Sequence, residues 1–198
     1  MRAISGLLKP SAGEIRAKLD GVDVVVTDLD SYDVVRHGIA HVPEGRGLFA
    51  PLSVYDNLIA GSLFPRARSR RHERLEFVFG LFPRLRERSG QISSSLSGGE
   101  QQMLALGRAL MTCPELLILD EQSIGLSPRV VTEFYRVLRE LKQRTGITLL
   151  VIEQDIHHIA RICDYAHVMS AGRIVRSLQR GELKQETVKE HYLGGRRS

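Results

Sequence analysis

Two short runs of this chain show no alternation of apolar and polar residues, and an acidic side chain follows each at once. Leu116–Leu119 is wholly apolar and precedes Asp120 and Glu121. Ile147–Ile152 contains one threonine and precedes Glu153. A strand without alternation is covered on both faces, as in a parallel sheet, and open α/β sheets bind ligands at the carboxyl ends of their strands. The sequence therefore predicts an α/β fold with carboxylates at its ligand-binding edge.

A second constraint is the glycine-rich stretch Ser95–Gln102, which begins a helix. Ser97 followed by Glu100 forms a capping box, in which each side chain bonds a free backbone N–H of the first turn. Capping alone does not explain Gly98 and Gly99, because a helical glycine costs up to about 1 kcal/mol relative to alanine. A ligand that approaches the bare backbone would explain them, and a helix N-terminus suits a phosphate.

Together these stretches resemble the ATPase subunits of ABC transporters. Ser95–Gln102 resembles their signature motif, and Leu96–Leu110 looks like its form in branched-chain amino-acid importers. Asp120 and Glu121 resemble the second Walker motif. The resemblance implies ATP and Mg²⁺ as cofactors, with Asp120 on the metal and Glu121 as the catalytic carboxylate. It also implies that Ser97–Glu100 faces nucleotide held by a second ATPase subunit, identical or different.

Several departures from the general pattern resemble the branched-chain subclass. Glu44 stands where most members have a glutamine that senses Mg²⁺, and a carboxylate is also a hard oxygen ligand. Taken alone, Glu44 would be a surface acid. Gln154 stands where most members have a histidine that contacts the γ-phosphate, although a glutamine is no general base. Gln122 replaces a proline, which puts the rigidity of its loop in doubt, and Tyr192–Gly195 also resembles the subclass.

The resemblance implies a P-loop NTPase fold with a three-layer core and an inserted helical subdomain. The expected RecA-like α/β core comprises residues 1–49 and 103–198, and the helical subdomain comprises residues 50–102 and ends in the signature motif. Such a subdomain docks on a transmembrane permease, and a periplasmic or extracellular solute-binding protein takes part indirectly. The expected location is therefore the cytoplasmic face of the cell membrane, as a peripheral subunit.

Composition agrees with that assignment. Hydrophobic residues make up 42% and charged residues 26% of the 198, and no apolar run is long enough to span a membrane. Cys113 and Cys163 form no metal-ligand pattern, which favours a reducing compartment. The net charge of +5 is compatible with a nucleic-acid partner. No aromatic residue interrupts the basic cluster, however, so we expect a solvated helix face and no nucleic-acid partner. That cluster comprises Arg66, Arg68, Arg70, Arg71 and Arg74.

One required motif is absent from the sequence. A phosphate loop of the form Gly-x-x-x-x-Gly-Lys-Ser/Thr wraps the phosphates, yet no glycine here is followed by lysine. Arg2–Leu8 matches the rest of the helix that this loop normally caps, so we expect an N-terminally truncated ATPase. Two functions follow: an ATP-hydrolysing subunit that powers import of branched-chain amino acids, or a non-hydrolysing interaction subunit that lends its signature to a partner ATPase. Urea or short amides are alternative solutes.

Overall fold

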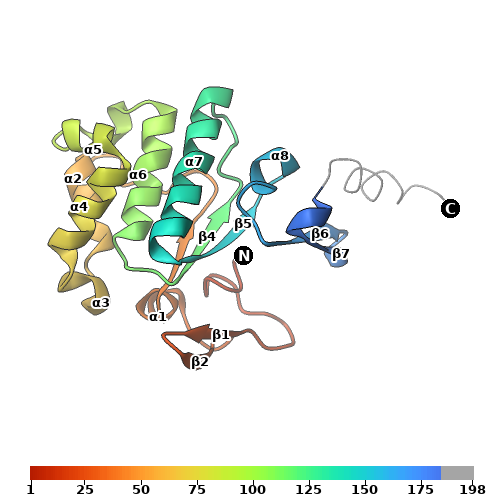
Figure 1. The fold of residues 1–198 in the computed structure, drawn as a ribbon. Helices are drawn as coiled ribbons and strands as arrows, with labels where there is room; N and C mark the ends of the chain where they lie inside the picture. Colours follow the sequence, from red (N-terminus) through yellow and green to blue (C-terminus); the bar gives the residue numbers. More distant parts are fainter. Residues whose placement is uncertain (184–198) are drawn as a thin grey trace. The chain divides into compact units, whose positions relative to one another are not determined.

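Three parallel strands form the central sheet, in the order β3-β4-β5. They are β3 (Ile39–Val42), β4 (Leu116–Asp120) and β5 (Thr148–Ile152). The computed structural model describes residues 1–183 and divides into two compact units, Met1–Ile152 and a second that begins at Glu153. Both predicted strands and their parallel pairing are confirmed (Figure 1).

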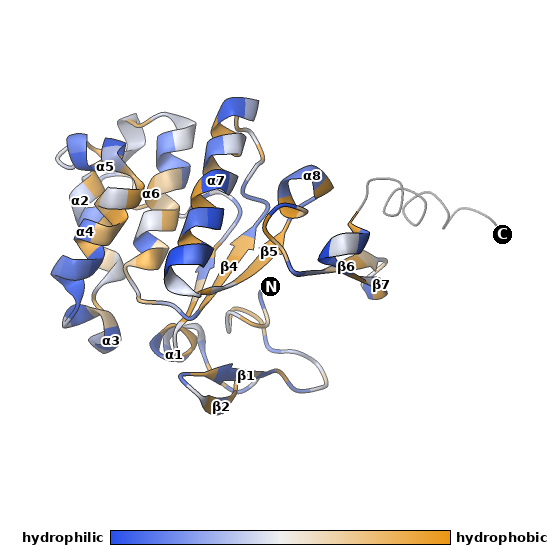
Figure 2. Cartoon of the chain, viewed as in Figure 1, coloured by the Kyte–Doolittle hydropathy of each residue, from blue (hydrophilic) through white to orange (hydrophobic). Residues whose placement is uncertain are grey.

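The two apolar strands differ in burial. Leu117, Ile118 and Leu119 of β4 are completely buried, because β4 has a hydrogen-bonded neighbour on each side. Leu149–Ile152 of β5 is only half-buried, so the prediction of a second fully buried strand is wrong. The reason is position, since β5 lies at an edge of the sheet in the described part of the chain. Both strands are equally apolar in sequence, as Figure 2 shows in orange.

Eight helical segments accompany these strands in the first unit. Segments α2 to α5 follow β3, as the predicted helical insertion requires, and α7 connects β4 to β5 in the crossover that parallel strands need. They are α1 (Ser31–Arg36), α2 (Val54–Gly61), α3 (Pro65–Arg68), α4 (Arg71–Leu81), α5 (Pro83–Glu87), the 3-10 turn η1 (Ser93–Ser95), α6 (Gly98–Leu110) and α7 (Pro128–Thr145). The division into residues 1–49 with 103–198 and residues 50–102 stays a prediction.

Helices α2 and α6 pack closely through a glycine. A Cβ on Gly61 would collide with the backbone carbonyl oxygen of Arg108, so the two helices pack backbone against backbone at this point. The buried amide of Asn57 fixes the loop before α2, because it donates to the carbonyl oxygens of Phe49 and Ser53, each at 3.0 Å. Helix α6 is thereby held against the helical insertion.

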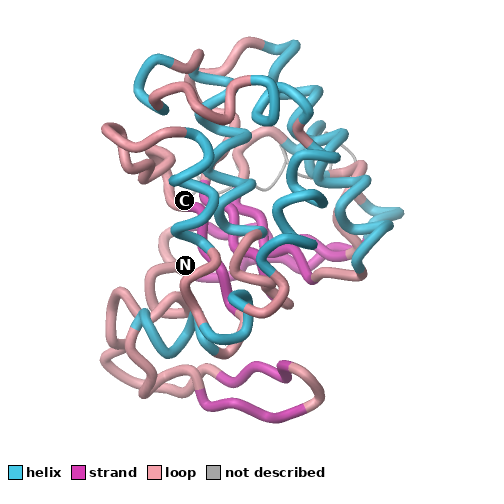
Figure 3. The backbone as a smooth tube through the Cα atoms, turned by 90° about the vertical axis from the view of Figure 1, so that its left-hand side faces the viewer, coloured by secondary structure: helices cyan, strands magenta, loops and turns pink. Residues whose placement is uncertain are grey.

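The start of the chain differs from expectation. Residues 2–6 form turns and no α-helix, so the predicted helix end over Arg2–Leu8 is wrong. Gly6 adopts the left-handed backbone (φ 69°), while Leu7 and Leu8 are each 60% exposed and give a helix no packing. A hairpin follows, in which β1 (Arg16–Leu19) pairs antiparallel with β2 (Val22–Val25), visible in Figure 3.

The second unit contains a short helix and a hairpin. Helix α8 (Ile156–Ile159) precedes β6 (Tyr165–Ser170) and β7 (Arg173–Gln179), which pair antiparallel and lead into the 3-10 turn η2 (Arg180–Glu182). Ala171 and Gly172 both have positive φ, which suits a tight two-residue turn. Tyr192–Gly195, which resembles the branched-chain subclass in sequence, lies outside the described residues. Nowhere in residues 1–183 is a helix both long and apolar enough to cross a membrane.

Candidate functional site

The predicted acidic residues meet at one edge of the sheet. Val42 and Leu119 are paired residues of neighbouring parallel strands. Glu44 and Glu121 each follow this pair by two residues, so both leave the sheet at its carboxyl edge. Asp120 is the last residue of β4 and is half-buried, as is Glu121, whereas Glu44 is exposed. The carboxylates therefore occupy the edge where the sequence places the ligand.

Glu121 has an unusual backbone. Its φ is 49°, the left-handed region that a side chain with a Cβ rarely adopts. Two hydrogen bonds hold the conformation, since the Glu121 N–H donates to the Ile152 carbonyl at 3.1 Å and Ile124 N–H donates to the Glu121 carbonyl at 3.5 Å. Strain of this kind persists only where the surroundings impose it, and it gathers at functional positions. The sequence alone gave no signal for it.

The capping box at the start of α6 is confirmed. The Ser97 hydroxyl accepts from the Glu100 N–H at 3.4 Å, and the Glu100 carboxylate accepts from the Ser97 N–H at 3.0 Å. The Ser97 hydroxyl also donates to that carboxylate at 2.7 Å, and this bond does most to lower the pKa of Glu100. Arg88, 3.1 Å away, contributes in the same direction. Glu100 is therefore committed to the cap and to Arg88.

Side chains of this same chain approach the two signature glycines. A Cβ on Gly99 would lie 2.8 Å from Val130 Cγ1 of α7, so packing alone requires glycine there. A Cβ on Gly98 would lie 3.1 Å from an Arg46 guanidinium nitrogen. Packing is therefore a second reason for glycine at position 99, and the predicted approach of a ligand to Gly98 and Gly99 stays a prediction. Gly98 instead leaves the helix N-terminus beside a cationic group, which suits an anion.

Gln122 is the residue that joins the parts of this edge. It is 3% exposed, and its amide nitrogen donates to the carbonyl oxygens of Asp120 at 2.5 Å and Val42 at 3.2 Å. Its amide oxygen accepts from the side chain of Gln102 on α6. One side chain thus connects β3, β4 and the signature helix. The predicted doubt about the rigidity of this loop is wrong, because the glutamine forms more bonds than a proline can.

Arg46 adds a second connection that the sequence analysis did not single out. It lies two residues after Glu44 with φ 70°, and it donates to Gln101 at 2.6 Å and to Gln102 at 3.4 Å. A second contact runs in the opposite direction, because Arg108 of α6 donates to the carbonyl oxygen of Gly47 at 2.5 Å. An arginine between two glycines was the available signal, because only a constrained loop needs that pattern. The Glu44 loop is thus tied to the signature helix from both sides.

His41 on β3 is the remaining polar group near this edge. Its Nε2 is buried and has no hydrogen-bond partner among the described residues. Burial lowers the pKa of His41, and the Asp120 charge opposes that shift in part. The histidine is therefore held neutral beside the acidic edge.

Gln154 belongs to the second unit. It is exposed, and its N–H donates to the Glu153 carboxylate at 3.1 Å. It lies two residues after Ile152, which is the register partner of Asp120 in the sheet. Its proposed contact with the γ-phosphate stays a prediction.

The donor set at this edge fits Mg²⁺ bound together with a phosphate ligand. Asp120 and Glu44 offer carboxylate oxygens, the ligands that Mg²⁺ prefers. Among residues 1–183 no three or more histidine, cysteine, aspartate or glutamate side chains converge into a metal cluster. Mg²⁺ usually keeps water and phosphate ligands, so two carboxylates are sufficient for a nucleotide site but not for a site made by protein alone.

The comparisons with known proteins agree with this geometry. A family profile described as ABC transporter matches residues 1–123. The chain is 38% identical over 196 residues to the high-affinity branched-chain amino acid transport ATP-binding protein BraG of Pseudomonas aeruginosa, covering 98% of this chain and 82% of that protein. It is 31% identical to the lipopolysaccharide export system ATP-binding protein LptB of Escherichia coli K12, covering 96% and 78%. The ADP conformation of MJ1267, an ATP-binding cassette of an ABC transporter, matches with a TM-score of 0.75 at 26% identity, covering 98% and 81%. The predicted fold class is confirmed.

Proposed function

This chain belongs to the ABC transporter family of ATPases, and from that premise we propose that it energises the uptake of branched-chain amino acids. The solute is proposed because BraG, at 38% identity, is named for branched-chain amino-acid transport. LptB is named for lipopolysaccharide export, so family membership by itself does not define the solute. Urea and short amides remain the alternative cargo.

The observation that carries the proposal is the shared edge of Glu44, Asp120 and Glu121 beyond the paired residues Val42 and Leu119. Bound Mg²⁺-ATP supplies the phosphoryl group and the charge that orders water. Asp120 would hold the metal with help from Glu44, and Glu121 would orient the attacking water and accept its proton. The left-handed backbone of Glu121 fixes the direction in which its side chain leaves the end of β4.

The signature helix has a second role in the same proposal. Ser97, Gly98, Gly99 and Glu100 begin α6, and we assign this helix start to the γ-phosphate of nucleotide held by a second ATPase subunit, with Glu100 holding the cap. Support comes from the helix N-terminus and from the Arg46 guanidinium beside Gly98. The sequence contains no glycine followed by lysine, so a phosphate loop is not among these residues. A non-hydrolysing interaction subunit is therefore the alternative function.

We assign permease docking to the helical insertion and the Glu44 loop. Four large apolar side chains between residues 49 and 63 are at least 39% exposed, which suits a partner surface. They are Phe49, Leu52, Tyr55 and Leu63. This docking would place the chain at the cytoplasmic face of the membrane and link it indirectly to a solute-binding protein. Cross-linking that labels α7 alone would contradict the assignment.

Two substitutions in the natural transporter complex test the function. If the chain hydrolyses ATP, Glu121→Gln should trap ATP and lower turnover by at least about 100-fold, because the water loses its acceptor. Ser97→Arg should block the γ-phosphate position of the partner's site. Asp23→Asn at an exposed position of β2, outside the proposed docking surface, is the control and should resemble wild type.

The outcomes separate the two functions and the solute. An interaction subunit would tolerate Glu121→Gln and lose activity only with Ser97→Arg. Tolerance of both substitutions would contradict the site altogether. Uptake of radiolabelled leucine, with urea and a short amide compared in parallel, identifies the cargo. Uptake of urea or the amide without leucine would refute the branched-chain assignment.

A further inference from the structure

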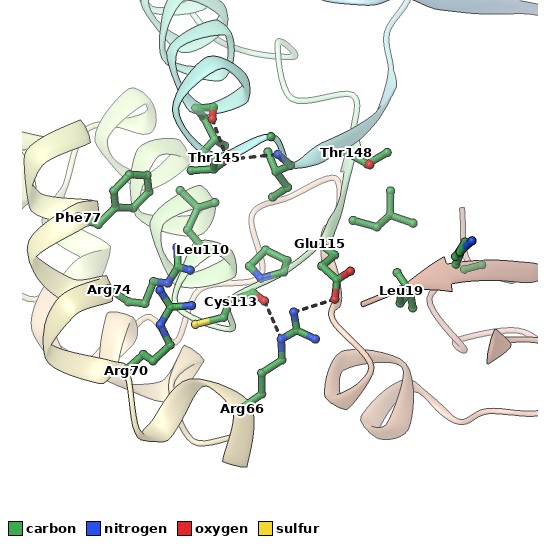
Figure 4. Close-up of a pocket in the computed structure, with 17 residues that line it drawn as sticks. Leu19, Arg66, Arg70, Arg74, Phe77, Leu110, Cys113, Glu115, Thr145 and Thr148 are labelled. Atoms are coloured by element: carbon green, nitrogen blue, oxygen red, sulfur yellow. Dashed lines mark hydrogen bonds and ion pairs between the residues drawn. The ribbon is translucent and has the colours of Figure 1, made fainter. Parts of the chain in front are cut away.

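A pocket of about 470 Å³ lies at the amino ends of β4 and β5, the end of the sheet opposite to Asp120 (Figure 4). Its volume falls in the range of small-molecule sites, about 300–1,000 Å³. Its lining carries four cationic groups and one carboxylate, which are Lys18, Arg66, Arg70, Arg74 and Glu115. We call it the arginine pocket. Its positive charge exceeds what its own acid can balance.

Arg66 is a fixed part of the pocket wall. Its Nε donates to the Cys113 carbonyl at 3.1 Å. Its two terminal nitrogens pair with Asp20 at 2.5 Å and with Glu115 at 2.7 Å. Figure 4 shows the Arg66 guanidinium between Cys113 and Glu115. These contacts also neutralise Glu115, so the pocket lining offers no second carboxylate to Lys18, Arg70 and Arg74.

Two of the remaining cations are Arg70 and Arg74. They are four residues apart at the start of α4, so their side chains share one face, and like charges at this spacing repel. Arg70 is paired with Glu73 at 2.7 Å, so Lys18 and Arg74 carry the positive charge that is in no ion pair within residues 1–183. The Arg74 Nε is buried and has no hydrogen-bond partner within residues 1–183. A buried unpaired donor is unfavourable, and an acidic ligand would satisfy it and offset the repulsion.

The sequence run of arginines is not one solvated face. Arg68 is exposed and does not line the pocket, and Arg71 donates to the Ser62 hydroxyl at 2.8 Å. The guanidinium of Arg74 lies 5.9 Å from the centre of the Phe77 ring, which also lines the pocket. A rigid planar fork placed in this way recognises carboxylate or phosphate groups in a defined orientation.

We propose that the arginine pocket binds a small anion with two or more acidic groups, and that the bound anion clamps α4 to the segments that enter β4 and β5. Residues from all three segments line the cavity: Arg74 from α4, Cys113 before β4 and Thr148 in β5. The site lies at the end of the sheet opposite to the predicted nucleotide edge and goes beyond the proposed transport function. It would let a soluble metabolite stabilise one arrangement of the helical insertion.

Citrate and inorganic pyrophosphate are the probes, because they present the two acidic chemistries on small molecules. At constant ionic strength, each should raise the thermal unfolding midpoint of the whole chain in a saturable manner. Calorimetric titration should show affinity at least about tenfold weaker for Arg74→Gln and Lys18→Gln, since each loses one unpaired positive charge of the pocket lining. The tighter probe identifies the acidic group.

Matched controls decide the result. Arg68→Gln removes the same charge from the neighbouring exposed position and should bind like wild type. Ser97→Ala changes the opposite end of the sheet and should also keep the shift, which separates this site from the nucleotide edge. Equal weakening by Arg68→Gln and Arg74→Gln, or no saturable shift with either probe, would overturn the proposal. If Arg74→Gln does not fold, Lys18→Gln at an exposed position decides. Neither result depends on ATP hydrolysis.

Discussion

The two ends of the β3-β4-β5 sheet are held together by different chemistry. At the carboxyl end, the buried amides of Gln102 and Gln122 connect the strands to the signature helix. At the amino end, Arg66 connects the helical insertion to Asp20 and Glu115 by ion pairs that are half-exposed. Buried neutral hydrogen bonds are insensitive to salt, whereas partly exposed charges are screened by it. The predicted nucleotide edge is therefore held by contacts that salt leaves in place, while the opposite end can respond to ions.

The largest effect is expected at the carboxyl end. Gln122→Leu keeps the side-chain volume but leaves the Gln102 amide and the Val42 carbonyl without a partner. We expect the free energy of unfolding to fall by about 2–4 kcal/mol, since each stranded buried group costs about 1–3 kcal/mol. Urea unfolding at low and at high salt should give the same loss. Gln143→Leu, on the exposed side of α7, is the control and should change little. A loss shared by both variants would contradict the role of the amide.

The amino end should give a smaller and salt-dependent loss. Arg66→Gln removes charged hydrogen bonds to Glu115, Asp20 and Cys113, and we expect a loss of about 1–2 kcal/mol at low ionic strength. Near 1 M salt, where the Debye length is about 3 Å, much of the difference from wild type should vanish. Arg68→Gln is the matched control in the same unfolding series. A loss for Arg66→Gln that salt leaves unchanged would break the comparison.

A smaller effect tests why glycine begins the signature helix. Gly99→Ala should destabilise the chain by about 1 kcal/mol, because its Cβ would press against Val130. In a Val130→Ala background the same change should become neutral or stabilising, since alanine favours a helix. Unfolding free energies of the wild type, the two single variants and the double variant form a double-mutant cycle. A loss that persists without the valine would return the explanation to the backbone itself or to a ligand.

Local patterns predicted much of this structure because each records a local physical requirement. The spacing of Ser97 and Glu100 predicted the capping box, and the apolar run before Asp120 predicted a strand buried on both faces. The same reasoning failed for β5, whose exposure depends on what lies beside it in the sheet. Periodicity reports the residues of a strand and carries no information on its neighbours.

The contacts that organise the candidate site were beyond local patterns. Gln122 was visible only as a missing proline, yet its partners lie 80 residues away at Val42 and 20 residues away at Gln102. Arg46 is likewise 55 residues from Gln101. Contacts at such separations are set by the packing of whole elements, so no window of sequence contains them. The prediction that the basic cluster forms one solvated face was wrong for the same reason, because only the fold places Arg74 in the pocket and Arg68 outside it.

The smallest predicted effect is a pH dependence confined to the carboxyl end. Burial lowers the pKa of His41 below its ordinary value of 6.5, with Asp120 opposing and the N-terminal ammonium group assisting the shift. Below pH 6.5 the unfolded chain therefore binds a proton that the folded chain resists. The contribution of His41 is fully present above that pH and is lost as the pH falls toward the folded-state pKa.

His41→Gln removes the titration and keeps a polar side chain. The unfolding free energy of wild type should consequently drop more between pH 7.5 and pH 5.5 than that of the variant, and the difference should be smaller than the Arg66 effect. Carboxylates such as Glu100 titrate in both proteins and cancel in the comparison. Because the shift originates in burial and not in an ion pair, raising the salt should leave the difference in place. Parallel pH profiles for the two proteins would show that the buried ring gains access to water or to an acid, and the carboxyl edge would then be less rigid than its amide contacts indicate.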